Sequence, residues 1–158
     1  MKQDSSTVSL VYSVVKETLA YQQSQKTSLE TKASALTAFA GGMFALLMGA
    51  RETLLLLGKT SQTLILICVA LFAVSVILAN IVTWIRKYRA DPDPEALAQN
   101  YLEVPLQEIQ LQLISNMIGT WKSNKTLIER NAIYLRFGFL LQAIAFILLG
   151  SALFLSIL

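Results

Sequence analysis

The sequence of 158 residues contains no histidine and a single cysteine, Cys68. Without histidine, the chain lacks the commonest metal ligand and the commonest general base. One cysteine cannot form a disulfide within the chain, and we interpret Cys68 as a small apolar residue that faces lipid or a neighbouring helix. These two absences remove most metal centres and most hydrolytic sites.

Charge is also scarce, because only 15% of the residues are Asp, Glu, Lys or Arg while 54% are hydrophobic. A soluble domain usually has about a quarter of its residues charged. No charged residue occurs in three stretches, 33–50, 60–85 and 137–158. Since about 18 or more apolar residues are needed for a helix to cross a bilayer, the sequence predicts three membrane spans.

Motifs of catalysis are missing as well. The sequence has no Gly-rich phosphate loop, no HExxH, no CxxC and no Ser–His pair, and no acidic residue lies within the three uncharged stretches. We therefore expect no enzyme activity, no cofactor, no metal site and no ion-coupled transport. The net charge of +3 comes without a dense Lys/Arg run, so we expect no nucleic-acid partner either.

Proline is absent before Pro92, and glycine is absent before Gly41, so nothing interrupts a helix through the first 40 residues. Residues 5–32 and 105–134 each show apolar residues at helical spacing.

The predicted fold class is all-α: an integral membrane protein of three transmembrane helices, with long amphipathic cytoplasmic helical extensions on the first and third. We expect a single helical membrane domain over 1–158, divided as follows: an amphipathic helix 5–32, spans 33–57, 60–85 and 135–158, a cytoplasmic linker 86–104, and an amphipathic helix 105–134. Each amphipathic half should pack its apolar face against the other, within one chain or between chains.

The topology follows from the basic residues. Arg86, Lys87 and Arg89 directly follow the second span, and the positive-inside rule places this end in the cytoplasm. The N-terminus is then cytoplasmic and the C-terminus lies outside. Asp91-Pro92-Asp93-Pro94 predicts a turn after this span, and 95–101 is a candidate short helix.

Four residues inside the spans are candidates for helix packing or for lining a pore. Gly42 and Gly49 lie on one face of the first span, which we expect to be buried against another helix, since small residues let backbones approach closely in lipid. Asn80 and Gln142 are the most polar side chains in the spans. We favour hydrogen bonds between helices for both, with a pore lining as the alternative.

Basic residues near the cytoplasmic span ends are the candidate ligand-binding residues: Lys32, Lys122, Lys125, Arg130 and Arg136. They suit an anionic ligand such as a nucleotide phosphate. They suit equally the positive-inside rule and contact with anionic lipid, which we favour for the four that precede the third span. Glu129 lies four residues after Lys125 and is expected to pair weakly with it.

Several segments together resemble a known family. Glu30-Thr31-Lys32-Ala33-Ser34 opens the first span, Asp93-Pro94-Glu95 forms a turn followed by Tyr101, and Asn124, Leu127 and Arg130-Asn131-Ala132 precede the last span. Over roughly residues 25–158 the chain is similar to the small membrane effectors of bacterial Pycsar defence, which are associated with nucleotide second messengers. Arg130 stands where that family is expected to have Lys, a change that keeps the charge and alters the hydrogen-bond geometry.

The resemblance implies a bacterial inner-membrane effector of antiviral defence that responds to a cyclic nucleotide and impairs the membrane, as a homo-oligomer in the lipid bilayer. The alternative is a small membrane scaffold whose cytoplasmic helical stalk binds a protein partner. The first hypothesis predicts depolarisation with a trigger nucleotide, and the second predicts a partner that is lost when residues 105–130 are removed.

Overall fold

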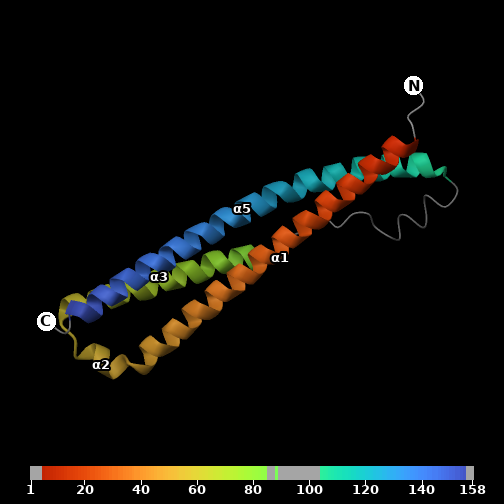
Figure 1. The fold of residues 1–158 in the computed structure, drawn as a ribbon. Helices are drawn as coiled ribbons and strands as arrows, with labels where there is room; N and C mark the ends of the chain where they lie inside the picture. The colour runs from red at the N-terminus through yellow and green to blue at the C-terminus, as the bar shows by residue number, and fades with distance from the viewer. Residues whose placement is uncertain (1–4, 85–87, 89–103, 156–158) are drawn as a thin grey trace. The chain divides into compact units, whose positions relative to one another are not determined.

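The structure, a computed structural model, describes residues 5–84, 88 and 104–155. The described residues form four helices and no strand: α1 (Ser5–Gly49), α2 (Arg51–Leu55), α3 (Lys59–Thr83) and α5 (Leu106–Leu155) (Figure 1). The all-α fold class is thus confirmed. The predicted linker 86–104, with the candidate helix 95–101, lies outside the described residues except for Tyr88 and Val104.

The two long helices are continuous, which the absence of proline predicted for the first and the sequence left open for the second. α1 joins the predicted amphipathic segment 5–32 to the first span without a break, and α5 joins 105–134 to the third. The first span differs at its end, since α1 stops at Gly49 and a separate short helix, α2, follows. Ala50 adopts φ −89° and ψ 8°, which interrupts the helical geometry between them. The second span, predicted over 60–85, appears as α3 and begins after Gly58, which is extended.

Three helices are long enough and apolar enough to cross a membrane: α1, α3 and α5. The contacts of the chain fall into two compact units, where a single one was expected. Unit 1 comprises Met1–Thr27 and Arg86–Glu129, and unit 2 comprises Ser28–Ile85 and Arg130–Leu158. The long helices therefore supply residues to both units, and α3 contributes to unit 2 alone.

Unit 1 is a pairing of α1 with α5. Its buried residues are Val8, Gln22, Leu113, Ile114, Met117, Thr120 and Asn124. The side-chain amide of Gln22 donates a hydrogen bond to the main-chain oxygen of Trp121 (Nε2–O 3.0 Å). The Lys26 ammonium lies 4.8 Å from the centroid of the Tyr88 ring, at cation–π distance. The expectation that the amphipathic halves pack on each other is met within one chain.

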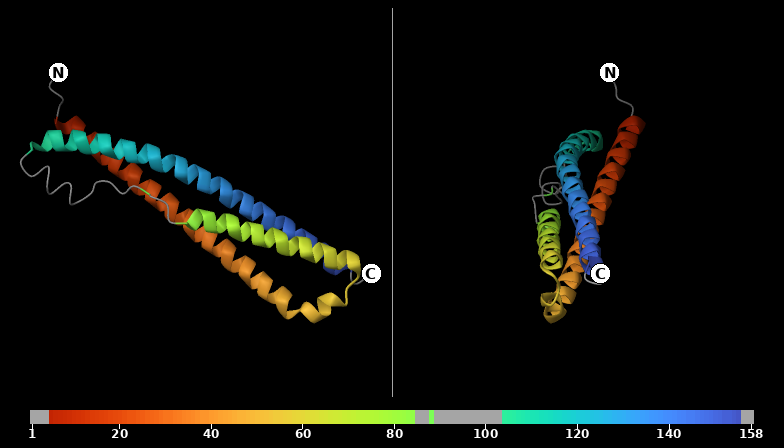
Figure 2. Two further views of the ribbon diagram at one scale, coloured as in Figure 1. Left: turned by 180° about the vertical axis from the view of Figure 1, so that it is seen from behind. Right: turned by 90° about the vertical axis from the view of Figure 1, so that its left-hand side faces the viewer.

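Unit 2 packs α1, α3 and α5 together, and α3 lies alongside α5 in each view (Figures 1 and 2). The buried positions on α3 recur at alternating intervals of three and four residues: Ser61, Ile65, Cys68, Phe72, Ser75, Ala79 and Val82. The same alternation appears on α5 at Leu135, Gly138, Gln142, Ala145, Leu149 and Ala152. A period of 3.5 residues is the spacing of coiled-coil packing, in which one face of each helix stays against its neighbours.

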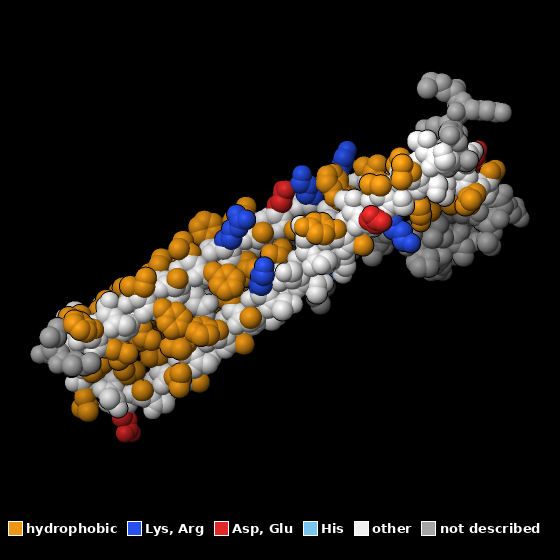
Figure 3. Space-filling view, in the orientation of Figure 1, with side chains coloured by type: hydrophobic (Ala, Val, Ile, Leu, Met, Phe, Trp, Pro, Cys, Tyr) orange, Lys and Arg blue, Asp and Glu red, His pale blue; other side chains and the backbone are white. Residues whose placement is uncertain are grey.

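Unit 2 buries several small side chains beside larger ones such as Leu36 and Phe72. Ala33, Cys68, Ala145 and Ala152 are fully buried, and Ala40 and Ala79 nearly so. Large hydrophobic side chains such as Leu66, Ile77 and Ile147 point outward instead, and Figure 3 shows hydrophobic side chains spread over the surface of this unit. Large apolar groups outside and small groups between helices are what lipid as a solvent favours.

Candidate functional site

The predicted ligand-binding cations are divided between the two units. Lys122 and Lys125 belong to unit 1, whereas Lys32, Arg130 and Arg136 belong to unit 2. All five side chains are exposed. Specific recognition of a nucleotide usually needs an enclosed pocket. Exposed cations are better suited to contact with water or lipid headgroups.

Two of these cations have local contacts on α5. The Lys125 ammonium lies 3.9 Å from the Glu129 carboxylate, which is the predicted pair four residues apart, and 5.3 Å from the centroid of the Trp121 ring. Both charged side chains are more than half exposed, so the pair adds little stability. Arg136 borders a shallow apolar hollow with Ile133, Phe137 and Leu140 of the same helix.

Gln142 makes contact between helices in unit 2. It is buried, and its amide nitrogen lies 3.5 Å from the main-chain oxygen of Leu36 on α1. A Cβ at Gly138, one turn earlier, would lie 3.5 Å from Cδ1 of Leu36 and 3.6 Å from the main-chain oxygen of Ser75. The three helices therefore approach closely at this level, which fits the helix-packing interpretation of Gln142.

Two further side chains link α3 to α5. The Cys68 thiol donates to the main-chain oxygen of Ala145 (Sγ–O 3.2 Å), and the Asn131 amide lies 3.4 Å from the main-chain oxygen of Val82. The hydroxyl oxygen of Ser75 is fully buried and has no hydrogen-bond partner among the described residues. The contact of Asn131 and the burial of Ser75 were not predicted from the sequence. The burial of Ser75 could have been predicted from the three- and four-residue spacing that it shares with Ser61 and Cys68.

Asn80 is placed differently from Gln142. Its side chain is exposed on α3, and its amide nitrogen donates to the main-chain oxygen of Val76 on the same helix (3.0 Å). Such a local bond satisfies part of the amide without a partner helix. Asn80 therefore does not join helices within the chain.

The glycine face of α1 is open within the chain. A Cβ added at Gly42 or Gly49 would meet nothing within 4 Å, and Ala38 and Ala45 on the same face are exposed as well. The buried residues Ala33, Leu36 and Ala40 lie on the other side of the helix. The expected burial of this face thus does not occur within one chain, because α3 and α5 both pack on the opposite side.

Comparison with protein-family models, with curated proteins and with solved structures finds no match for this chain. Within the described ranges, no group of three or more His, Cys, Asp or Glu side chains could hold a metal ion. What the described residues define is a helical chain with three helices able to cross a membrane, and with one face of the first helix unpacked.

Proposed function

We propose that this chain is an integral membrane protein that assembles through the open face of α1, and that the assembly acts as a bacterial effector which impairs the inner membrane on a cyclic-nucleotide signal. The observation that carries the proposal is the row of small residues Ala38, Gly42, Ala45 and Gly49, here called the small-residue face. Elsewhere in unit 2, small residues mark the places where helices meet. The small-residue face has the same composition, yet its alanines are exposed and a Cβ at either glycine meets nothing within 4 Å among the described residues.

The burial of the three spans supports assembly through α1. In the most apolar stretch of α1, 17% of the residues are buried, against 28% in each of the other two spans. The first span is therefore the least covered by the rest of its own chain. Small residues at intervals of four let helices approach closely enough for van der Waals contact to hold them together in lipid.

The interior of unit 2 supports a role for the assembly rather than for one copy. Leu36 and Phe72, each at most 2% exposed, fill the space between the helices together with the small residues. A path for ions would then have to form between copies. Exposed Asn80 is a polar side chain that could face such a path.

The proposed orientation has the N-terminus in the cytoplasm. Three spans place the N-terminal segment on the same side as the connection between α3 and α5. Unit 1 comprises Met1–Thr27 and Arg86–Glu129, and so includes the N-terminal segment, most of this connection and the first part of α5. Arg51 and Lys59 are the only two of the 13 basic residues that fall on the other side. The positive-inside rule therefore assigns unit 1 to the cytoplasm.

The test combines expression in bacteria with a potential-sensitive dye. We expect a panel of cyclic nucleotides to include one that depolarises cells expressing the chain and leaves control cells polarised. Substituting Gly42→Leu and Gly49→Leu should abolish the response and shift the detergent-solubilised protein to a smaller mass. Gly150→Leu is the matched control, because Gly150 on α5 also has nothing within 4 Å. Unchanged potential with every nucleotide would contradict the effector role.

The alternative function, a membrane scaffold, is favoured by a different observation. Leu10, Val14 and Tyr21 lie on one face of α1 in unit 1, and each is more than half exposed. Exposed apolar residues on one face of a helix outside the membrane are typical of a surface that binds another protein. Leu10→Gln with Val14→Gln should remove such a partner from a pull-down while the chain remains in the membrane. If the double variant retains every partner of the wild type, the scaffold role fails at this surface.

A further inference from the structure

The end of unit 2 where α1 turns into α3 contains an apolar groove that the sequence analysis did not anticipate. It is lined by α1, α2 and α3, including Phe44, Met48, Leu55 and Leu66, and has a volume of about 330 Å³. That volume lies within the range of about 300–1,000 Å³ that is typical of small-molecule sites. All of its lining residues belong to unit 2.

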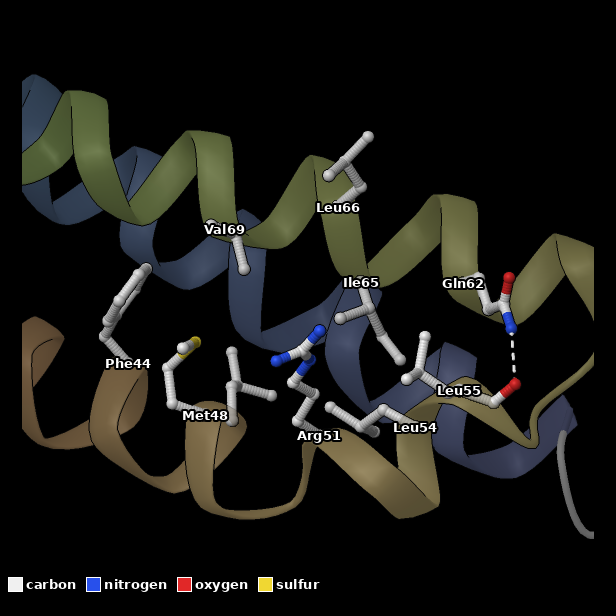
Figure 4. A pocket seen from close by; sticks show the side chains of 10 residues that line it. Phe44, Met48, Arg51, Leu54, Leu55, Gln62, Ile65, Leu66 and Val69 are labelled. Carbon is white, nitrogen blue, oxygen red and sulfur yellow. Dashed lines mark hydrogen bonds between the residues drawn. The ribbon is translucent and has the colours of Figure 1, made fainter.

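One charged side chain enters this groove. Figure 4 shows the Arg51 side chain reaching from the start of α2 into the space between α1 and α3, among Met48, Ile65 and Leu54. No carboxylate among the described residues pairs with Arg51, and the neighbouring Glu52 is exposed without bordering the groove. An unpaired cation beside apolar side chains favours an anion at that position.

The floor of the groove is held in place by a side chain of α3. The Gln62 amide donates to the main-chain oxygens of Leu55 (2.9 Å) and Leu57 (3.1 Å), which end the short helix α2. Gln62 thus satisfies carbonyl groups that a helix end leaves open. This contact fixes α2 and its Arg51 relative to α3, so the groove is shaped by the fold rather than by a loose turn.

We propose that the groove binds one anionic phospholipid, whose acyl chain lies along Phe44, Met48 and Leu66 and whose phosphate is held by Arg51. The position of the groove argues for this occupant. Arg51 begins α2, between the helices α1 and α3 that are able to cross a membrane, and the groove extends along the apolar part of both. In the proposed topology this turn lies where headgroups meet hydrocarbon. A guanidinium binds a phosphate through two parallel hydrogen bonds, and basic pockets between membrane helices bind lipid headgroups in this way.

The lipid site is separate from the small-residue face. On α1, the groove residues Phe44, Met48 and Arg51 lie away from Gly42 and Gly49, since residues three or four apart share a face of a helix. Lipid binding therefore does not depend on the effector role, and each can fail without the other.

Native mass spectrometry of the full-length protein in detergent, with added phosphatidylglycerol or phosphatidylcholine, tests the proposal. We expect bound phosphatidylglycerol in preference to phosphatidylcholine. Arg51→Gln should weaken the binding of phosphatidylglycerol by on the order of tenfold, the size of one lost charge-assisted contact. Lys59→Gln is the matched control, because Lys59 is an exposed cation of the same turn that does not line the groove, and it should bind as the wild type does.

A second variant tests the acyl-chain part of the site. Leu55→Trp places a larger side chain on the wall of the groove and should also reduce lipid binding, with helicity by circular dichroism as the check on folding. Equal binding of the two lipids, or equal losses in Arg51→Gln and Lys59→Gln, would overturn the proposal. So would full binding in Leu55→Trp, or a dimer that is lost in Leu55→Trp and retained in the Gly42→Leu, Gly49→Leu variant, since a second copy would then occupy the groove.

Discussion

Unit 1 and unit 2 are built from the same two long helices, yet they bury different kinds of side chain. Unit 1 buries Leu113, Ile114 and Met117, as a protein does in water, where the removal of apolar area from solvent drives packing. Unit 2 buries alanines, Cys68 and Gly138 beside larger side chains such as Leu36 and Phe72, while Leu66, Ile77 and Ile147 are exposed. Buried alanines thus distinguish unit 2 from unit 1, and we propose that they reflect packing in lipid rather than in water.

The buried polar groups of the two units, in contrast, are satisfied in the same way. Unit 1 buries Gln22, and the main-chain oxygen of Trp121 accepts from it at 3.0 Å. In unit 2, three side chains donate to main-chain oxygens of neighbouring helices, from Cys68, Asn131 and Gln142. In hydrocarbon these contacts are the main alternative to an unsatisfied polar group.

The largest expected effect comes from opening the core of unit 1. Met117 is 1% exposed, and Met117→Ala should lower the free energy of unfolding by about 2–5 kcal/mol because it leaves a cavity in a core packed in water. Urea unfolding, followed by Trp121 fluorescence in a Trp84→Phe background, measures the change. Ile118→Ala, at an exposed neighbour, is the control and should change stability much less. Equal losses of stability in both variants would contradict the view that burial of apolar side chains stabilises unit 1.

A somewhat smaller effect is expected from enlarging a small residue in unit 2. Ala145 is fully buried against α3, and Ala145→Leu should destabilise the helix packing by about 1–3 kcal/mol through overpacking. Ala143→Leu, two residues earlier and exposed, should be tolerated. Unfolding in mixed micelles of increasing SDS content gives both values. Should Ala145→Leu be as stable as the wild type, close approach of α3 and α5 would not be what holds unit 2 together.

The amide of Gln142 should contribute less. Gln142→Leu removes the contact with the Leu36 oxygen and should cost about 0.6 kcal/mol, the mean measured for side-chain hydrogen bonds between membrane helices. Asn80→Leu is the matched control, because Asn80 bonds only to its own helix, and it should cost nothing. The same SDS titration compares them. A greater loss of stability for Asn80→Leu than for Gln142→Leu would show that the contact between helices is made by Asn80 and not by Gln142.

The smallest expected effect is that of the surface pair in unit 1. Glu129→Gln removes the partner of Lys125, and the change in unfolding free energy should stay below about 0.5 kcal/mol because both side chains are largely exposed. Trp121, which lies near Lys125, provides the fluorescence signal. A loss above 1 kcal/mol in low salt, removed by high salt, would show that this pair contributes more than its exposure suggests.

The helices could be predicted from the sequence because their causes are local. The lack of proline and of charge predicts the start of α1 and most of α3, and the helical spacing of apolar residues in 5–32 and 105–134 marks the amphipathic parts of α1 and α5. The first span was predicted to reach residue 57, whereas α1 ends at Gly49. The break at Ala50 was missed, since it follows from how the chain turns toward α3. The amide of Gln62 stabilises that turn by donating to the main-chain oxygen of Leu55, seven residues earlier. A glutamine at this position does not by itself indicate such a contact.

The buried face of each span could not be predicted from hydropathy, because the spans are apolar on every side. The information lies in the small and polar residues instead, such as Ala33, Ser75, Gly138 and Gln142, which recur with the packing period. The same feature led to the expectation that Gly42 and Gly49 are buried, although α3 and α5 pack on the other side of α1. The Arg51 groove depends on three helices meeting, so residue order alone did not indicate it.

Two cysteine variants on α5 test most directly whether unit 2 lies in lipid and unit 1 in water. Leu111 and Ile144 are 42% and 40% exposed in the structure, so in plain solvent both positions should react alike. In a Cys68→Ala background in lipid nanodiscs, Leu111→Cys should react fast with a charged, water-soluble maleimide, and Ile144→Cys should stay unmodified until the lipid is removed. Equal labelling of the two positions in nanodiscs would contradict the account.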